Sequence, residues 1–446
     1  MQAKFLLIFV LLGTFTSRAQ QLNLSPYSSY GIGSLDDFGH PTFTALGGSF
    51  TANADSTIVN YMNPASYSRL GKGQPLFSCA FSSRHGSFEQ TGLNEKYHSN
   101  SINHFALAVP FANRFAWSFG LKPFSKTGYQ VNDYQLVNGD SIEYIYRGSG
   151  SMNELFTGYS VNLFDIKGQQ LSLGAHLSYL FGSSIHQQSA SITTASSGGV
   201  EERNYQVKSI FYNFGLQYSS NFKYGRNLTL GFTYTPAQQL TASKSSTLYD
   251  APDVSNEQSF SQLSFSKENN SINLPASMAL GFAFRFRPKN DSTYNRTRVY
   301  QLTLYGDFKS TSWSQYRANF TGEQNALFQD GSSLNVGLEF APHFQMNHRN
   351  TNINYFSRIR YRTGYQQIAL PYHDNGIQRT DSGITFGLLF PILSQRSVSS
   401  LSIGVKMGQQ ESSYPESLKE KYLGVHFGVT IAPGVYDRWF RKYKID

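Results

Sequence analysis

The chain has 446 residues, which is long enough for two or three ordinary domains or for one β-barrel. Its 36 Phe, 29 Tyr and 38 Gly, with only 15% charged residues, favour strands and tight turns over helices. The 37 basic and 28 acidic residues give a net charge of +9, but no basic cluster belongs to a recognisable nucleic-acid module, so we expect no DNA or RNA partner.

Residues 1–19 predict a cleaved signal peptide. Lys4 precedes an apolar core, and small residues at Ser17 and Ala19 come before the expected cut, so the mature chain is predicted to begin near Gln20. No later apolar run has the length of a membrane-spanning helix, which excludes a helical membrane protein. The single cysteine, Cys79, cannot form an internal disulfide, so we expect an exported chain that is stabilised in another way.

Residues 20–74 contain no strand-like alternation and are rich in Gly and Pro. Pro64 fixes its own φ and keeps Asn63 extended, while Ala65 leaves room for a close approach of main chain. The Asn63 amide, with two donors and an acceptor, is suited to cap main-chain groups. A simple turn before the first strand explains the same residue types, and their spacing alone does not decide between the two interpretations.

From Leu76 onward, large apolar residues alternate with small or polar ones. In "YLGVHFGVTI" every second side chain is large and apolar, which is typical of a strand with one apolar face. We count about fourteen such segments up to Tyr436, an even number, and many are long enough to cross an outer membrane. Short connections such as "FANR", "FKYGRN" and "LSQRS" take turns with long polar segments, "NDYQLVNGDSIEY", "ASITTASSGGVEER" and "LYDAPDVSNEQSFSQLSFSKENN".

This pattern predicts an all-β fold, a transmembrane antiparallel β-barrel of about 14 strands over residues 75–436. The short connections are expected to be periplasmic turns and the long ones external loops, and residues 437–446 a basic periplasmic tail. A barrel of this width has a lumen that its own side chains do not fill. We therefore expect residues 20–74 to form a hatch, or plug, inside the lumen.

The stretch "ALGGSFTANADSTIVNYMNPASYSRL" resembles the hatch of the FadL/TodX family of outer-membrane transporters for hydrophobic compounds. The shared features are paired glycines, a run of small residues with an Asp, and Asn-Pro-Ala shortly before the first strand. "SPYSSYGIGSL" resembles the start of FadL-like barrels from Bacteroidota. The hatch motif carries over to Gly47, Gly48, Asn63, Pro64 and Ala65.

The same resemblance implies a sideways exit for substrate at a kink in the third strand. Here the third strand, "RFAWSFGLKPFSKTGYQ", contains Gly120, Lys122 and Pro123, and a strand proline removes a ladder hydrogen bond. These three residues are our candidates for a lateral opening. Prolines also occur in or beside other strands, at Pro110, Pro236 and Pro342, so an ordinary bulge explains the third strand equally well.

Charged and ring side chains provide further candidate sites. Arg358, Arg360 and Arg362 recur at every second residue and are expected to point together into the lumen, either to receive a ligand carboxylate or to pair with carboxylates of the chain. We favour the second, structural interpretation. The candidate acids are Glu339, Asp307, Asp36, Asp37 and Asp55, while His104, His176 and His426 are interpreted as polar lumen lining, not as metal ligands.

No nucleophile elbow, zinc signature, P-loop or dinucleotide fingerprint is found, so we predict no catalytic residues, no metal and no cofactor. Our first hypothesis is an outer-membrane channel for passive uptake of a hydrophobic or amphipathic, fatty-acid-like molecule, gated by the hatch, with lateral exit at the third strand. The alternative is a non-transporting FadL-like barrel that acts as a partner subunit of an outer-membrane protein secretion or assembly machine. The expected partners are outer-membrane lipid, a hydrophobic ligand and, in the alternative, other outer-membrane or periplasmic proteins.

Overall fold

The computed structural model describes residues 25–35, 39–71, 75–111, 114–137, 140–192, 198–288, 300–323, 328–343, 354–393 and 398–432. The predicted signal peptide and basic tail lie outside these residues. Within these ranges no helix combines the length and apolar character needed to cross a bilayer. The helices are all short: η1 (Pro26–Ser29), α2 (Pro41–Thr44), η2 (Pro64–Arg69), η3 (Lys223–Gly225), η4 (Glu257–Ser259), η5 (Trp313–Gln315) and η6 (Tyr355–Arg358).

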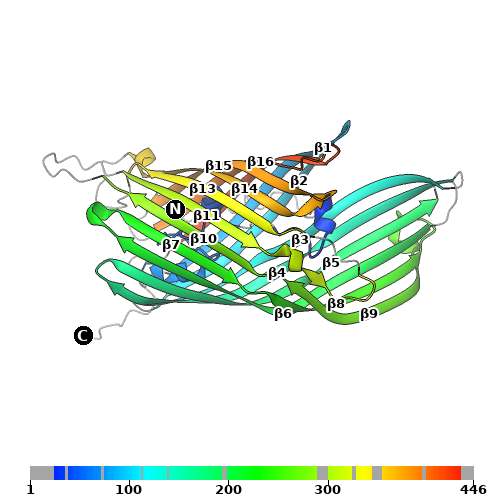
Figure 1. Cartoon of the computed structure of the whole chain (residues 1–446), viewed down its shortest axis with the longest axis horizontal. Coiled ribbons are helices and arrows are strands. Elements are labelled where there is room, and N and C mark those ends of the chain that lie inside the picture. The colour runs from blue at the N-terminus through cyan, green and yellow to red at the C-terminus, as the bar shows by residue number, and fades with distance from the viewer. Residues whose placement is uncertain are drawn as a thin grey trace, which may run out of the picture.

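All strand segments belong to one antiparallel sheet (Figure 1). They are β1 (Leu76–Gln90), β2 (Leu93–Pro110), β3 (Phe115–Val137), β4 (Asp140–Ile166), β5 (Gln169–Ile192), β6 (Gly198–Asn221), β7 (Asn227–Thr235), β8 (Gln238–Asp250), β9 (Ser261–Leu274), β10 (Ser277–Phe286), β11 (Gln301–Thr311), β12 (Arg317–Ala318), β13 (Gly331–Ala341), β14 (Arg360–Asp374), β15 (Ile377–Leu393), β16 (Val398–Glu411) and β17 (Lys419–Ile431).

The seventeen segments make fourteen barrel strands. Three barrel strands are interrupted and appear as two segments each. The interruptions lie at Pro236 between β7 and β8, at Pro275 between β9 and β10, and at η5 between β11 and β12. Each pair of segments therefore counts as one strand. The partners agree, because β6 pairs with both β7 and β8. The last strand pairs with the first, from Phe77–Ile431 to Glu89–Lys419, which closes the cylinder. The predicted all-β barrel of about 14 strands is confirmed.

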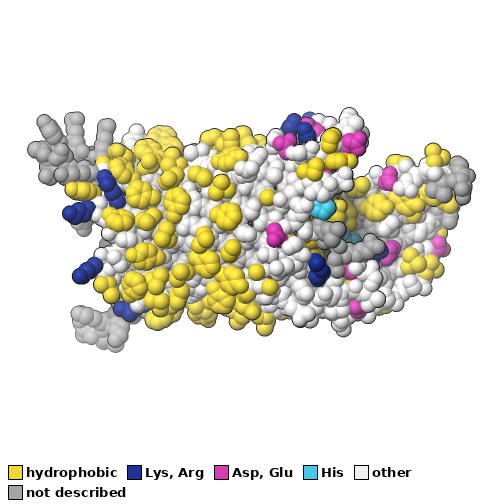
Figure 2. Space-filling view, viewed as in Figure 1, with side chains coloured by type: hydrophobic (Ala, Val, Ile, Leu, Met, Phe, Trp, Pro, Cys, Tyr) yellow, Lys and Arg dark blue, Asp and Glu magenta, His cyan; other side chains and the backbone are white. Residues whose placement is uncertain are grey.

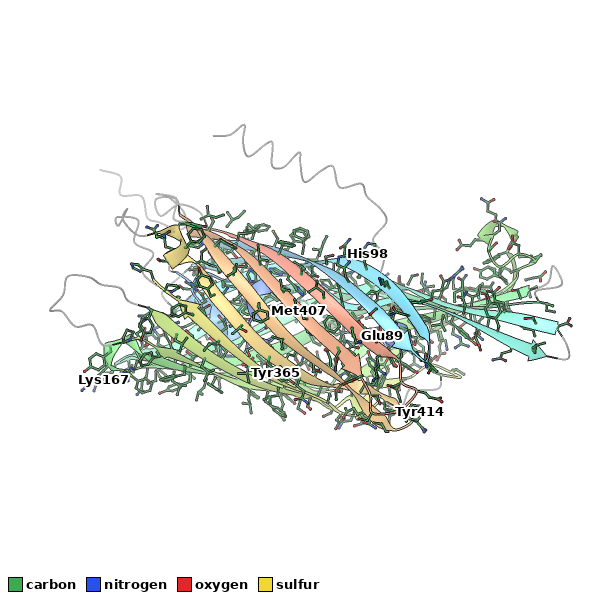
Figure 3. The ribbon with its side chains drawn as sticks, turned by 90° about the horizontal axis from the view of Figure 1, so that it is seen from above. Glu89, His98, Lys167, Tyr365, Met407 and Tyr414 are labelled. Carbon is green, nitrogen blue, oxygen red and sulfur yellow. The ribbon has the colours of Figure 1, made fainter. Side chains whose placement is uncertain are left out.

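The alternation seen in the sequence puts the large apolar side chains on the outside of the barrel. Leu423, Met407, Ile384 and Tyr365 are direct neighbours across β17, β16, β15 and β14 and are 38–54% exposed. In hydrocarbon such a surface is favourable, and the pairing of β1 with β17 closes the ladder around the cylinder. Figure 2 shows apolar side chains crowding one half of the molecule, and in Figure 3 Met407 and Tyr365 lie on this belt.

One side of the barrel continues well beyond the apolar belt. β4 has 27 residues, whereas a transmembrane strand needs about ten. β3–β6, β8 and β9 extend together at the end opposite the short turns, and we call their outer parts the projecting sheet (Figure 1). In outer-membrane barrels the short turns face the periplasm, so we assign the opposite end, which carries the projecting sheet, to the external side.

The prediction of long external loops is wrong, because most of these residues form the projecting sheet. Most of each of the three polar segments lies in strands: only residues 138–139 separate β3 from β4, and loop residues 251–260 separate β8 from β9. Polar residues occupy neighbouring positions in these strand ends, so their sequences lack the alternation that marks the membrane part. Backbone pairing with equally long neighbours keeps them extended.

Candidate functional site: the filled lumen

Residues 39–71, which we call the plug, lie inside the barrel and are mostly buried. Many wall positions that face them are glycines, because a Cβ at these positions would collide with the plug. At Gly337 a Cβ would lie 2.6 Å from the Leu46 carbonyl oxygen, and at Gly404 it would lie 2.8 Å from the Pro41 oxygen. The other wall glycines in contact with the plug are Gly158, Gly174, Gly215, Gly231, Gly281, Gly364, Gly387 and Gly428.

The paired glycines of the hatch motif make a turn against this wall. Gly47 and Gly48 have φ values of 67° and 89°, a region that favours glycine. The Gly47 N–H donates to Thr385 Oγ1 at 3.0 Å. Just after the turn, the Asp307 carboxylate accepts from the N–H groups of Phe50 and Thr51 at 2.8 and 2.7 Å, so a wall acid binds plug main chain.

Asn63 caps η2, as its amide chemistry leads one to expect. Its Oδ1 accepts from the Ala65 N–H at 3.1 Å, and its Nδ2 donates to the Thr51 oxygen at 2.7 Å. Pro64 occupies the first helical position, where its missing N–H costs nothing. The motif therefore joins two distant parts of the plug. Its role in gating stays a prediction.

The arginine run divides into two parts. Arg358 lies in η6, outside the strand, which corrects the expected three-residue ladder. Arg360 pairs with Asp55 of the plug, and Arg362 pairs with Glu339 of the wall at 2.7 Å. Burial raises the pKa of the Asp55 carboxyl, but the Arg360 guanidinium outweighs this effect and holds that pKa well below its usual range. Arg360 and Arg362 are thus already bound to carboxylates of the chain.

The three strand histidines lie in hydrogen-bond networks at or near the plug. His104 contacts the Tyr61 hydroxyl at 3.0 Å, and His176 contacts that of Tyr67 at 2.7 Å. His426 lies 3.4 Å from an Asn103 amide. Among the residues that the structure describes, no three His, Cys, Asp or Glu side chains form a metal-binding group.

The wall is incomplete between β2 and β3. Only Phe105–Pro110 of β2 pair with β3, over Ala116–Leu121, while β3 stays paired with β4 along its whole length. Gly120, Lys122 and Pro123 therefore stand where the β2–β3 ladder ends, and the β3–β4 register shifts just after Pro123. Lys122 turns inward to the Glu154 carboxylate at 2.6 Å. A lateral exit at this gap stays a prediction.

Residues 25–35, which we call the strap, cover part of the free edge of β3. Ser34 and Lys126 exchange two backbone hydrogen bonds, at 2.8 and 3.0 Å. The Ser28 hydroxyl both donates to the Gly128 oxygen and accepts from its N–H, each at 3.0 Å. The strap also reaches the β14–β15 hairpin, where the Tyr27 hydroxyl donates to Asp374 at 3.3 Å. Sequence reasoning did not find this contact, because nothing in "SPYSSYGIGSL" signals pairing with a strand a hundred residues away.

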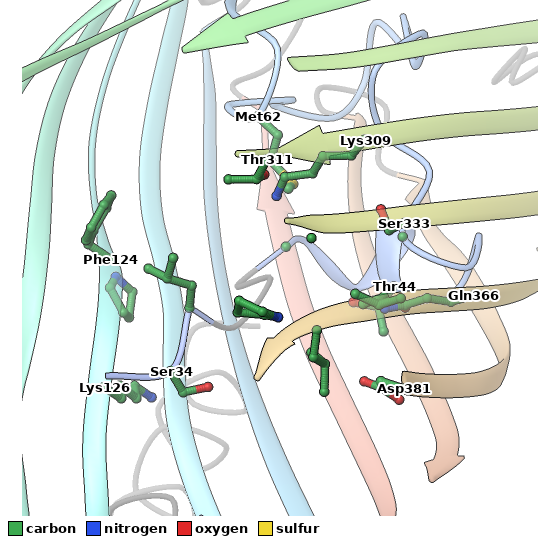
Figure 4. A pocket seen from close by; sticks show the side chains of 18 of the residues that line it. Ser34, Thr44, Met62, Phe124, Lys126, Lys309, Thr311, Ser333, Gln366 and Asp381 are labelled. Atoms are coloured by element: carbon green, nitrogen blue, oxygen red, sulfur yellow. The ribbon is translucent and has the colours of Figure 1, made fainter. Parts of the chain in front are cut away.

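Above the plug, a cavity of about 450 Å³ lies between β3 and the opposite wall (Figure 4). Its walls mix apolar and charged groups, with two more cations than carboxylates. Ser34 and Lys126 border it on the gap side. The apolar lining includes Phe43, Phe50, Met62, Phe124, Phe211 and Trp313, the cations are Arg84, Lys122, Lys126, Lys309 and Lys406, and the acids are Glu154, Asp381 and Glu420.

A closed fourteen-stranded outer-membrane barrel, with N-terminal chain folded into its lumen and a gap beside the third strand, is a FadL-like barrel. The BamG family model matches residues 1–446, and the chain belongs to the BamG family.

Solved structures show the same fold at low sequence identity. A Pseudomonas aeruginosa FadL homologue is similar at 13% identity with a TM-score of 0.57, covering 88% of this chain and 98% of that one. The Ralstonia pickettii toluene transporter TbuX is similar at 13% identity and a TM-score of 0.53, with the same two coverages. The P. putida toluene transporter TodX is similar at 12% identity with a TM-score of 0.52, covering 89% of this chain and 98% of that one. No curated protein matches the sequence.

Proposed function

We propose that the protein is a plugged, non-transporting barrel that serves as a subunit of an outer-membrane protein assembly or secretion machine. The observation that carries the proposal is the strap at the β2–β3 gap, where Ser34 and Ser28 bind the β3 edge. A hydrophobic molecule leaving sideways has to displace these bonds. It also has to pass Lys122 and Lys126, whose charged amines are costly in a hydrocarbon path.

The projecting sheet supports the same proposal. Six strands extend outside the membrane on one side only, and uptake of a small molecule does not require such a structure. A broad surface beyond the bilayer suits contacts with other proteins. The FadL-like resemblance already allows a role in protein export machinery, and membership of the BamG family favours this role.

The experiment is isolation of the tagged protein from its native membrane in a mild detergent. We expect other proteins to remain bound at fixed stoichiometry through extensive washing. The same full-length protein with its tag moved to the other terminus is the control for proteins that bind the tag itself. A barrel that elutes alone and carries bound lipid contradicts the proposal.

A second candidate is uptake of an amphipathic anion, fatty-acid-like in shape, and the cavity favours it. Phe124 and Phe211 supply an apolar wall, while Lys126 stands at the gap with its amine directed at Ser101. A carboxylate near this amine and a chain along the aromatic wall fit the mixed lining. The solved relatives named as toluene transporters support this candidate through their fold alone.

Binding of a fluorescent fatty acid to the purified barrel tests the second candidate. Lys126→Met is expected to weaken binding about tenfold, because it removes one charge-assisted contact. Lys421→Met, which removes an exposed lysine on the outside of β17, is the matched control and is expected to bind normally. Equal affinity in wild type and both variants rejects the cavity as the ligand site.

A further inference from the structure

The projecting sheet has two edges, at β3 and at β9, and they differ in how much of each edge is covered by other parts of the chain. The β3 edge is partly covered by the strap. The β9 edge begins in the same way, because β12 pairs antiparallel with Ile272 and Asn273, and the Asn319 N–H then donates to the Ser271 oxygen at 3.0 Å. The chain after β12 follows this edge as far as Glu268, whose carboxylate accepts from the Thr321 N–H at 2.9 Å. Beyond that point, no described strand pairs with this edge of β9 from Ser261 to Lys267.

The uncovered part of β9 has a bulge at Leu263 and one lysine, Lys267, but none of the stronger protection of an edge strand, such as a proline or a covering segment. Residues 261–274 contain no proline, and every residue from Ser261 to Lys267 is exposed. Leu263 and Phe265 are 64% and 57% exposed, although they lie outside the membrane part of the barrel. Natural edge strands are normally short, bent or covered, because their free N–H and C=O groups attract another strand.

We propose that this edge is a docking site for an extended strand of a partner protein, which continues antiparallel along β9 from the place where β12 stops. Seven residues of edge correspond to about 23 Å of strand, enough for a partner strand of ordinary length. Backbone hydrogen bonds provide the affinity, and apolar side chains of the partner on the Phe265 side provide the selectivity. The inference rests on the proposed function and names the kind of contact that the machine makes with this subunit.

Amide hydrogen exchange on the full-length protein tests the inference directly. The sample isolated with its bound proteins in mild detergent is compared with the same chain refolded alone in that detergent. We expect amides within Ser261–Lys267 that face away from β8 to exchange about tenfold more slowly in the complex. The amides of β5, which is paired on both sides, are the internal reference and are expected to exchange equally in both samples.

A pair of variants adds a second measurement. Leu263→Lys combined with Phe265→Lys is expected to lower the amount of bound protein about tenfold, while unboiled migration in gels shows that the barrel still folds. Tyr134→Lys, at a side chain that is 63% exposed on β3 of the same sheet, is the matched control and is expected to keep its partners.

The possible failures are distinguishable. If proteins co-isolate at fixed stoichiometry but β9 amides exchange as fast as in the isolated barrel, the docking edge is wrong and the proposed function survives. If no protein co-isolates, both are wrong. Loss of partners in Tyr134→Lys as well as in the β9 variant also overturns the inference, because the effect then does not belong to this edge.

Discussion

The buried charges of the lumen are paired within the chain, and this decides what single residues do. Arg362 and Glu339 are 4% and 3% exposed and lie 2.7 Å apart on neighbouring strands. Arg360 joins the wall to the plug through Asp55. Two of the five candidate acids named from the sequence are thus the partners, whereas Asp307 binds plug N–H groups instead. Alternation put the arginines on one face, but only tertiary structure selects the acid.

Removing Arg362 is expected to be costly. Arg362→Met leaves the buried Glu339 carboxylate without its counter-charge and should lower the free energy of unfolding by about 3 kcal/mol. Denaturant unfolding in detergent, followed by tryptophan fluorescence, measures this. The double variant with Glu339→Gln removes both charges and is expected to recover most of the loss; equal stability of wild type and Arg362→Met contradicts the argument.

His40 of the plug gives the fold a pH dependence. It is fully buried, and its Nδ1 accepts from the Thr42 N–H at 3.2 Å. Burial, reinforced by Arg362, lowers the pKa of His40 from 6.5 to about 3. The unfolded chain therefore binds a proton that the folded chain does not, so this contribution to stability is full above pH 6.5 and is lost as the pH falls toward 3.

His40→Asn keeps an acceptor for the Thr42 N–H and removes the titrating ring. Wild type should lose about 2 kcal/mol of unfolding free energy between pH 7 and pH 5 through this group, and the variant should lose correspondingly less over the same interval. Denaturant midpoints at the two pH values provide the comparison. Parallel pH profiles for the two proteins show that His40 does not carry the effect.

At the scale of elements, the wall strands and the plug are matched through small residues. The rhythm of large and small residues identified the membrane strands from the sequence, because it reports the two different surroundings of a strand. It did not reveal which small positions touch the plug, since a glycine facing water and one facing Leu46 look alike in sequence. Nor did it reveal the projecting strands, where polar residues occupy neighbouring positions and the alternation is lost.

Gly337→Ala tests the match between wall and plug. The new Cβ would lie 2.6 Å from the backbone oxygen of Leu46, so plug or wall has to shift, at a cost of about 2 kcal/mol. Gly199→Ala is the control, because the atom nearest to its new Cβ would be 3.7 Å away, and its free energy of unfolding is expected to equal that of the wild type. A difference of less than about 0.5 kcal/mol between the two variants contradicts the match.

At the scale of the whole molecule, the chain is a closed cylinder with an apolar belt on the outside and its own N-terminal residues within. This predicts that the purified protein requires detergent and that unboiled samples migrate differently from boiled samples in gel electrophoresis, because the closed ladder resists denaturation until heated. Identical migration, or solubility without detergent, contradicts the barrel. The sequence predicted this architecture because lipid permits few solutions for a spanning chain.

The glycine-lined wall has a consequence for the order of assembly. Many inner wall positions are glycines in contact with the plug, so the wall has few side chains there that could pack without it. The plug precedes the barrel in the chain, and the seam between β1 and β17 joins the earliest strand to the last. We expect the cylinder to close around the plug, and refolding a chain that starts at residue 75, with and without a separate peptide of residues 25–71, measures how much closure depends on the plug.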